Sequence, residues 1–285
     1  MSTAIRSTGD PVEFRAAVFP FLKKDPVLNS VVLSSVEGRI QGIMHDPEPP
    51  LYVSLHEGGE VVGAVLWTAL RGIVLGSLAD DLVPPLVNAL ADLVPGAESA
   101  EGTATAAPIF AELFAARVGK NFQKIRGTRL HQLISFVEQK AAGTPRLATL
   151  ADVEITAELS QGYSIALGHD SSRALADTWV RGRIELERLW LWEDEGRAAS
   201  LVGRQGEAFG ATRIGPVYTP SEYRGHGYAS ALTAHVTQQI LAAGSAACLF
   251  TDLANPTSNK IYATIGYRPV ADFLGFSFTD QGRVV

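Results

Sequence analysis

Residues 214–230 read Ile-Gly-Pro-Val-Tyr-Thr-Pro-Ser-Glu-Tyr-Arg-Gly-His-Gly-Tyr-Ala-Ser, and this stretch decides the fold. It begins as a short β-type run from Ile214 to Thr219 and breaks at Pro220. The loop that follows carries Arg224 and two glycines, and a long helical pattern starts after it. A strand that leads through a glycine-bearing loop into a helix forms an anion site, because the first helical N–H groups lack an intrahelical partner and the helix dipole favours negative charge. Arg224 adds a guanidinium group suited to phosphate.

A second patterned stretch follows downstream, at residues 249–270. A β-type run ends at Leu253, and Asn255 then stands before a proline, where Asn is a strong helix N-cap. The short helical pattern from Thr257 to Ile265 carries Tyr262 and stops at a glycine. The two stretches together are more specific than either alone, because each has the strand-to-helix context that a genuine motif requires.

The first stretch resembles the pyrophosphate-binding signature of the GNAT superfamily of acyl-CoA-dependent N-acyltransferases, through the spacing Arg224-x-x-Gly227-x-Ala229. The second stretch is similar to a further GNAT signature, in which an Asn after the fifth strand and a Tyr on the next helix flank the cofactor. The resemblance covers residues 150–280 directly. The fold that it implies is α/β (α+β), with a mixed, mostly antiparallel sheet flanked by helices.

The resemblance also implies roles for the matching residues. Backbone groups of Val217, Tyr218 and Thr219, at a splayed strand edge, would pair with pantetheine amides and polarise the thioester carbonyl. The pyrophosphate would be cradled, largely by main-chain N–H groups, in the loop of Arg224, Gly225, His226, Gly227, Tyr228, Ala229 and Ser230. Asn255 and Ser258 would contact the cofactor. Tyr262 would be the general acid for the departing thiolate of CoA, a role that suits a phenol because it holds its proton at neutral pH.

Several of these residues have a simpler alternative role. His226 can be a solvated loop residue, and Asn255 can cap its helix, which does not exclude cofactor binding. Ser258 can be a polar residue of the first helical turn. Tyr262 can be a core tyrosine with a satisfied hydroxyl.

The sequence does not single out a general base for deprotonating an amine. The candidate carboxylates are Glu187, Glu193, Glu222 and Asp252. Each of them can equally be a solvated side chain.

Two tryptophans alternate with two leucines in an expected strand. Trp190 and Trp192 should therefore face the side opposite Leu189 and Leu191. The tryptophans can line an acceptor pocket or pack against the first half of the chain.

Hydrophobic periodicity and turn residues predict the remaining elements. Helices are expected mainly within residues 11–50, and at 80–93, 108–118, 153–167, 171–184, 228–242 and 257–265. Strands are expected at residues 51–55, 61–67, 72–78, 123–136, 188–192, 198–204, 208–219 and 247–253, with further β segments to residue 279. Pro20 predicts that the first helix ends near Val18. Gly143 and Pro145 indicate a linker at residues 139–150.

The order of expected elements starts again after residue 142, which predicts two tandem GNAT-like copies. We expect a degenerate domain at residues 1–142 and the acetyl-CoA-binding catalytic domain at residues 143–285. The first half carries Asp80 and Asp81 where the second half has its Arg-x-x-Gly loop. Because two carboxylates would repel a pyrophosphate, we expect the first half to have lost its cofactor site.

Composition narrows the class of protein. The chain has 285 residues and a formal net charge of −6, which argues against a nucleic-acid partner and is compatible with a cationic amine. The single cysteine, Cys248, excludes an internal disulfide. No apolar run is long enough to span a membrane, no metal-ligand pattern is present, and the expected location is the cytoplasm.

The expected activity is direct transfer of the acetyl group of acetyl-CoA to a primary amine of a small molecule or peptide. The expected partners are acetyl-CoA and that amine, with the chain a monomer or a homodimer. The alternative is a non-catalytic acyl-CoA-binding sensor, which would keep the phosphate loop and dispense with Tyr262.

Overall fold

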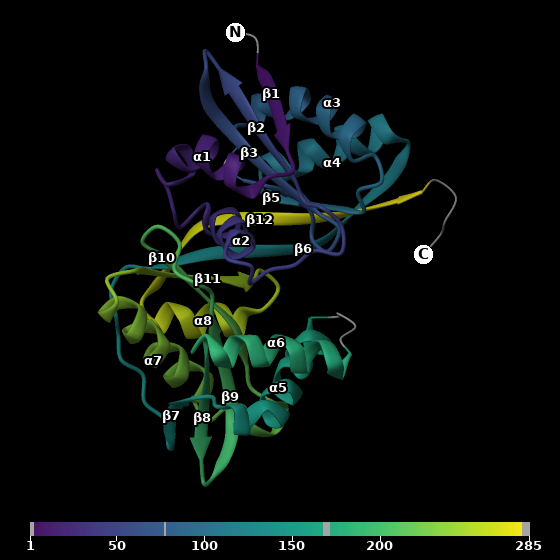
Figure 1. The fold of residues 1–285 in the computed structure, drawn as a ribbon. Coiled ribbons are helices and arrows are strands. Elements are labelled where there is room, and N and C mark those ends of the chain that lie inside the picture. The colour runs from purple at the N-terminus through teal and green to yellow at the C-terminus, as the bar shows by residue number, and fades with distance from the viewer. Residues whose placement is uncertain (1–2, 77, 168–171, 281–285) are drawn as a thin grey trace. The chain divides into compact units, whose positions relative to one another are not determined.

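Two successive sets of elements make up the computed structural model, which describes residues 3–76, 78–167 and 172–280 (Figure 1). The first set is β1 (Ala4–Thr8), α1 (Pro11–Leu22), α2 (Ser30–Ile40), β2 (Leu51–Glu57), β3 (Glu60–Thr68), β4 (Gly72–Leu75), the 3₁₀ helix η1 (Asp80–Leu82), α3 (Val83–Leu93), β5 (Ser99–Thr103), α4 (Ala106–Val118) and β6 (Lys120–Leu133). The second set is β7 (Thr144–Leu147), η2 (Leu150–Asp152), α5 (Val153–Ala166), α6 (Arg173–Glu185), β8 (Leu189–Asp194), β9 (Arg197–Arg204), β10 (Ala211–Tyr218), η3 (Ser221–Tyr223), α7 (Tyr228–Ala242), β11 (Ala246–Asp252), α8 (Pro256–Ile265) and β12 (Tyr267–Asp280). Apart from the 3₁₀ helices, both sets have the order β-α-α-β-β-β-α-β-α-β, so the predicted repetition of element order is confirmed.

Contacts divide the chain into two units. The first unit comprises Met1–Leu130, Thr251–Ala254 and Val270–Val285, and the second comprises His131–Phe250 and Asn255–Pro269. β12 therefore begins in the second unit and continues in the first. The limit expected at residue 142 falls between β6 and β7, where one set of elements ends and the next begins.

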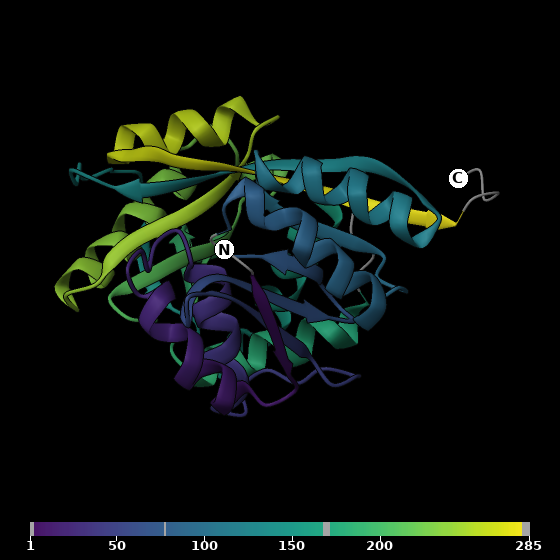
Figure 2. The same cartoon turned by 90° about the horizontal axis from the view of Figure 1, so that it is seen from above.

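The sheet of the first unit has the strand order β1-β2-β3-β4-β5-β12, and its pairs are antiparallel except β4 with β5. Val53 and Leu55 of β2 belong to the core formed with α3 and α4. Tyr52, which points the other way, stacks on Phe14 of α1 with ring centroids 5.0 Å apart. Helices therefore cover both faces of this sheet (Figure 2).

The sheet of the second unit has the order β11-β10-β9-β8-β7, with β10 and β11 as its parallel pair. Leu189 and Leu191 pack with α5 and α6, whereas Trp190 and Trp192 pack with α7 and α8. The predicted alternation along β8 is confirmed, and both tryptophans are buried within the second unit. The predicted fold class, a mixed and mostly antiparallel sheet flanked by helices, is confirmed as well.

The prediction that the first helix ends near Val18 is wrong. α1 continues through Pro20 to Leu22, because Phe19 and Leu22 are buried beside Val18 and this packing offsets the hydrogen bond that proline cannot make.

Three strands were missed. β7 lies inside the stretch expected to be a linker, β1 precedes the first predicted helix, and β5 lies between the helices expected at residues 80–93 and 108–118. All three are short. The residues of β1 and β7 are half-buried or exposed, and the buried residues of β5 are only Ala100 and Gly102, so none of these strands carries a strong hydrophobic pattern.

Candidate functional site

The candidate site begins at the end of β10. In the described chain, the parallel register of β10 with β11 runs from Ala211 to Ile214, and the antiparallel register with β9 shifts between Ile214 and Val217. The residues from Val217 onward therefore have no β11 partner in the described structure. Ser200 Oγ donates to the carbonyl of Tyr218 at 3.0 Å and lies 2.8 Å from Thr219 Oγ1, which holds this edge in place.

The loop between β10 and α7 presents main-chain N–H groups. Gly225 and Gly227 both have a φ of 84°, a left-handed conformation that favours glycine, and Gly227 is the N-cap of α7. Among the residues that the structure describes, the N–H groups of residues 225–230 have no acceptor, and residues 225–227 are exposed. No heavy atom lies within 4 Å of the position of a Cβ on Gly225. These donors and the positive end of the α7 dipole form a site suited to an anion.

The side chains of the loop hold its shape. Arg224 Nε donates to the carbonyl of Thr219 at 3.0 Å, and His226 Nδ1 lies 3.0 Å from the carbonyl oxygen of Arg224. The His226 ring stacks on Tyr228, with centroids 5.3 Å apart. Tyr228 is buried and its hydroxyl donates to Asp194, a hydrogen bond that raises the pKa of Tyr228. These contacts fix the loop without using the main-chain N–H groups of residues 225–230.

Residues 139–141, expected to belong to a linker, lie against this loop. Ser230 Oγ donates to Gln139 Oε1 at 3.4 Å, so the hydroxyl predicted to bind the cofactor has a protein partner. Ala141 Cβ and the carbonyl oxygen of Lys140 lie 3.7 Å from the position of a Cβ on Gly227. The sequence analysis did not predict these contacts, because Gln139 and Ser230 are far apart in the chain and no motif links them.

Asn255 caps α8, as its alternative role predicts. Its Oδ1 accepts a hydrogen bond from the N–H of Ser258 at 3.1 Å, and its carbonyl oxygen accepts one from Asn259 Nδ2 at 2.9 Å. Asn255 is exposed and Ser258 half-buried, so capping leaves the Asn255 side chain open to solvent.

Tyr262 lies on α8 in the core of the second unit and is 7% exposed. Its ring meets the ring of Tyr267 edge-on, with centroids 6.2 Å apart. Burial, and then the neighbouring Tyr163, raise the pKa of Tyr262 well above its ordinary value. The Tyr262 phenol is therefore protonated at neutral pH and can act as a proton donor.

Helix α5 contributes two residues that the sequence analysis did not single out. Tyr163 is close enough to Tyr262 to shift the pKa of Tyr262. A Cβ on Gly162 would lie 2.7 Å from the hydroxyl oxygen of Tyr218, so glycine is required for α5 to approach the end of β10 this closely. A glycine within a helical pattern is a signal of such an approach and could have identified Gly162.

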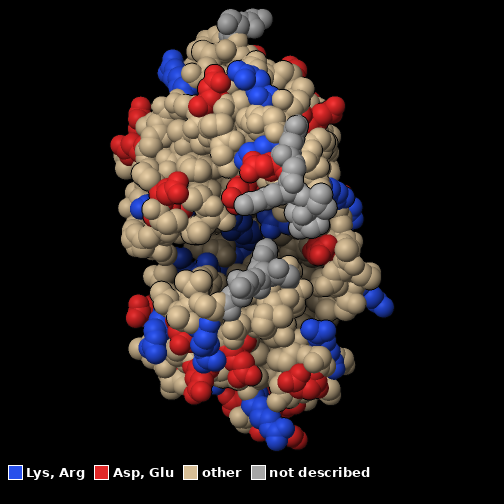
Figure 3. All heavy atoms as spheres, turned by 90° about the vertical axis from the view of Figure 1, so that its right-hand side faces the viewer, with Lys and Arg blue, Asp and Glu red and all other residues tan. Residues whose placement is uncertain are grey.

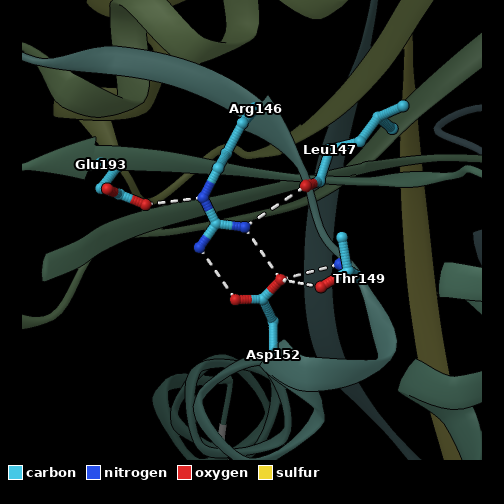
Figure 4. Close-up of polar contacts among 5 residues, drawn as sticks. All are labelled: Arg146, Leu147, Thr149, Asp152 and Glu193. Carbon is cyan, nitrogen blue, oxygen red and sulfur yellow. Dashed lines mark hydrogen bonds and ion pairs between the residues drawn. The ribbon is translucent and has the colours of Figure 1, made fainter. Parts of the chain in front are cut away.

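Glu193, a candidate base, belongs to a network of ion pairs (Figure 4). Arg146 Nε donates to Glu193 Oε2 at 2.6 Å, and the two terminal nitrogens of Arg146 donate to Asp152 at 2.8 Å. The hydrogen bonds from Arg146 lower the pKa of Asp152 well below its ordinary range. Thr149 also donates to Asp152, through its N–H and its hydroxyl. The network ties β7 and β8 to the start of α5, and Glu193 serves in it as a partner of Arg146.

The other candidate bases are exposed. Glu187 lies in the turn between α6 and β8, Glu222 accepts a hydrogen bond from Ser221 at 3.2 Å, and Asp252 accepts one from the N–H of Ala254 at 2.7 Å. Asp252 belongs to the first unit, and the others belong to the second. The geometry favours none of them as the base.

The equivalent turn of the first half differs in its donors. η1 starts with Asp80 and Asp81, and α3 then starts at Val83 and continues with Pro84 and Pro85. Prolines have no N–H, so this helix start lacks donors where an anion would need them, and the two carboxylates oppose negative charge.

The described residues also bear on metal binding and on membrane insertion. No group of three or more His, Cys, Asp or Glu side chains there could hold a metal ion. None of the described helices combines the length and the apolar character needed to cross a bilayer.

Comparison with known proteins identifies the fold. A family model described as FR47-like protein matches residues 196–273, which contain both the loop and Tyr262. A GNAT-family acetyltransferase from Colwellia psychrerythraea is similar with a TM-score of 0.62 and 10% identity, over 98% of this chain and 100% of that chain. A tandem GNAT protein from the clavulanic acid biosynthesis pathway is similar with a TM-score of 0.59 and 12% identity, over 100% of both chains. The chain has the GNAT fold.

A third GNAT structure agrees. The GCN5-related N-acetyltransferase from Sphaerobacter thermophilus is similar with a TM-score of 0.62 and 15% identity, over 99% of this chain and 98% of that chain. No curated protein matches the sequence. The GNAT resemblance expected from the two motifs is thus confirmed, and the GNAT fold supports acyl transfer in general.

Proposed function

We propose that the second half of the chain is an N-acetyltransferase that moves the acetyl group of acetyl-CoA to a primary amine. The observation that supports this most directly is the row of N–H groups at residues 225–230, at the start of α7, which have no acceptor in the described structure and of which the first three belong to exposed residues. A pyrophosphate offers the negative charge and the acceptor oxygens that these donors lack. Acetyl-CoA would supply an acetyl group activated as a thioester.

The residues around the end of β10 would position the donor. The strand edge from Val217 to Thr219 would offer main-chain groups to the pantetheine amides, and its N–H groups would stabilise negative charge that develops on the thioester oxygen. Ser200 and Gly162 support this edge from β9 and α5. Asn255, exposed at the start of α8, would flank the cofactor.

Tyr262 would be the general acid. Its raised pKa keeps a proton on Oη at neutral pH, and Tyr262 would give that proton to the departing sulfur. Because the phenol stays protonated over the physiological range, the alkaline limb of a pH–rate profile should not come from Tyr262.

The remaining parts of the proposal rest on the sequence. They are a cytoplasmic location, a monomer or homodimer, and a first half, residues 1–142, without a cofactor site. The absence of N–H donors at Pro84 and Pro85 supports the last of these.

Thiol release from acetyl-CoA across a panel of primary amines tests the activity, with binding of acetyl-CoA followed separately by calorimetry. We expect Tyr262→Phe to lower kcat by about 100-fold, with little change in acetyl-CoA affinity. The matched control is Tyr267→Phe, which removes another buried phenol with its own partner, Thr237, at 2.7 Å. That control should cost about 1 kcal/mol of stability and leave turnover intact.

Two results would count against the proposal. Undiminished turnover in Tyr262→Phe would show that another group is the acid. Tight binding of acetyl-CoA without turnover on any amine would favour the non-catalytic sensor.

A further inference from the structure

The segment at residues 134–143, here called the connecting segment, joins the two sets of elements and lies in the second unit. Gln139 Nε2 in its middle donates to the carbonyl of Thr264 near the end of α8, at 3.2 Å. Closer to its end, the carbonyl of Ala142 accepts a hydrogen bond from Trp192 Nε1 of β8 at 2.7 Å. The connecting segment is therefore held at two points, by α8 and by β8.

Between these two points the connecting segment lies against the loop that precedes α7. Ser230 Oγ donates to Gln139 Oε1 at 3.4 Å. The carbonyl oxygen of Lys140 lies 3.7 Å from the position that a Cβ on Gly227 would occupy, whereas no heavy atom lies within 4 Å of the corresponding position on Gly225. The connecting segment thus places Lys140 beside the first N–H groups of α7.

The ammonium group of Lys140 is available to a ligand. Its Nζ lies 3.8 Å from Glu138 Oε2, and the two side chains are 83% and 70% exposed. An ion pair between exposed side chains contributes little to stability, so Nζ can exchange this partner for a phosphate. The flexible four-carbon stem of lysine lets the ammonium group approach an anion from beside the loop.

Carboxylates lie close to the start of α7. The hydrogen bond to Asp194, burial, and the charges of Asp194 and Glu195 raise the pKa of Tyr228, the first residue of α7. Arg224, the cation within the loop, already uses its Nε on the carbonyl of Thr219. Figure 3 shows basic and acidic side chains interspersed over the face that it draws, and the formal net charge of the chain is −6. The charge of the whole protein therefore repels a ligand with several phosphate charges, and such a ligand needs cations at the site itself.

We propose that Lys140 pairs with a phosphate group of the CoA donor bound at the start of α7. The phosphate belongs either to the pyrophosphate or to the 3′-phosphate of the ribose, and an ammonium group suits both because it is a compact point charge with three donors. Lys140 lies outside residues 196–273, which the family model matches, so the first half of the chain leads directly into the cofactor site. The role of Lys140 rests on the proposed binding of acetyl-CoA and does not require turnover.

Calorimetric titration of the full chain with acetyl-CoA tests the pairing. The key variant is Lys140→Gln. Its control is Lys124→Gln, at an exposed lysine of β6 in the first unit, which changes the net charge by the same amount. We expect Lys140→Gln to bind acetyl-CoA at least about 5-fold more weakly than the wild type, and Lys124→Gln to bind it as the wild type does. Equal affinities of the two variants would overturn the proposal.

Two further measurements separate the charge of Lys140 from a structural role. Lys140→Arg keeps the positive charge and should retain most of the affinity that Lys140→Gln loses. Raising the ionic strength should narrow the difference between the wild type and Lys140→Gln, because salt screens an exposed pair of charges. Equal weakening in both variants, with a difference from wild type that salt does not change, would show that Lys140 only shapes the connecting segment and would refute the pairing.

An analogue then identifies the phosphate. Acetyl-dephospho-CoA lacks the 3′-phosphate, so with this ligand a lost difference between the wild type and Lys140→Gln assigns the 3′-phosphate as the partner, and a difference that persists assigns the pyrophosphate. The proposed function is decided separately by the wild type. Failure of the wild type to bind acetyl-CoA would refute both the proposed function and the role of Lys140, whereas binding without turnover on any amine would refute the transferase alone.

Discussion

The proposed binding of pyrophosphate by the loop at residues 224–230 can be tested by replacing Gly227 with alanine, because the same helix offers a matched control. Gly227 precedes α7 with a φ of 84°, and Gly244 follows the end of α7 with a φ of 76°. A Cβ would meet no atom closer than 3.7 Å at Gly227 and none within 4 Å at Gly244. Each substitution should therefore cost about 1–2 kcal/mol of backbone strain and create no clash.

Binding of acetyl-CoA should separate the two variants. At about 100 times Kd, a ligand stabilises the native state by about 2.7 kcal/mol. Alanine at position 227 shifts the N–H groups that would hold the pyrophosphate, and loss of one hydrogen bond to a charged group costs about 1.5–3 kcal/mol. The affinity would then fall by roughly 10-fold or more, and the stabilisation at the same ligand concentration would fall to about 1.4 kcal/mol or less.

Thermal unfolding with and without acetyl-CoA measures both effects. Without ligand, Gly227→Ala and Gly244→Ala should melt at similarly lowered temperatures, by about 2–4 °C for each kcal/mol. With ligand, the wild type and Gly244→Ala should regain the full rise in Tm, and Gly227→Ala should not. A full rise in Gly227→Ala would refute the assignment of this loop to the cofactor.

Three further predictions concern stability. Gly162→Ala should lower the free energy of unfolding by about 1–3 kcal/mol, because its Cβ would lie 2.7–2.8 Å from atoms of the Tyr218 side chain. The control Gly182→Ala, in open space on α6, should raise the free energy of unfolding by about 0.5–1 kcal/mol. Equal effects of the two substitutions in urea unfolding would contradict the close approach of α5 to β10. Asp152→Asn should lower the free energy of unfolding by about 1–2 kcal/mol at neutral pH. The pKa of Asp152 is lowered in the folded state, so the stability that the Asp152 carboxylate contributes is complete above its unfolded-state pKa of about 4 and is lost progressively as the pH falls below that value. Urea unfolding at about pH 7 and pH 3 should show the difference from wild type closing at the lower pH, and a constant difference would rule out the charge of Asp152 as its cause. Phe278→Ala should lower the free energy of unfolding by about 3–5 kcal/mol, because Phe278 is 4% exposed and packs on Phe114. The control Phe122→Ala, at a side chain that is 43% exposed, should lower it far less. Similar losses of stability in calorimetry would contradict the place of β12 in the core of the first unit.

The sequence predicted the structure best where the residues that define an element lie close together in the chain. The helix predicted at residues 228–242 has those bounds in the structure, because a glycine N-cap precedes it and its apolar positions recur at helical spacing. The loop before it and the cap at Asn255 were found for the same reason, since their defining residues lie within one turn of each other.

Features formed by residues far apart in the chain could not be found in this way. The contact of Gln139 with Ser230 joins a segment expected to be a linker to a helix, and no spacing rule connects them. The extension of α1 through Pro20 shows the same limit, because tertiary packing of Phe19 and Leu22 outweighs the local penalty of proline.

The position of β12 has a consequence for how the protein is made. This strand follows the whole second set of elements in sequence, yet it pairs with β5 and carries Phe276 and Phe278 into the core of the first unit. Tandem domains ordinarily fold one after the other as they leave the ribosome. Here the sheet of the first unit lacks β12 until nearly all of the second unit has been translated. A gene fragment cut between the two sets would therefore encode an unfinished sheet, so the halves of this chain are expected to be inherited and expressed together.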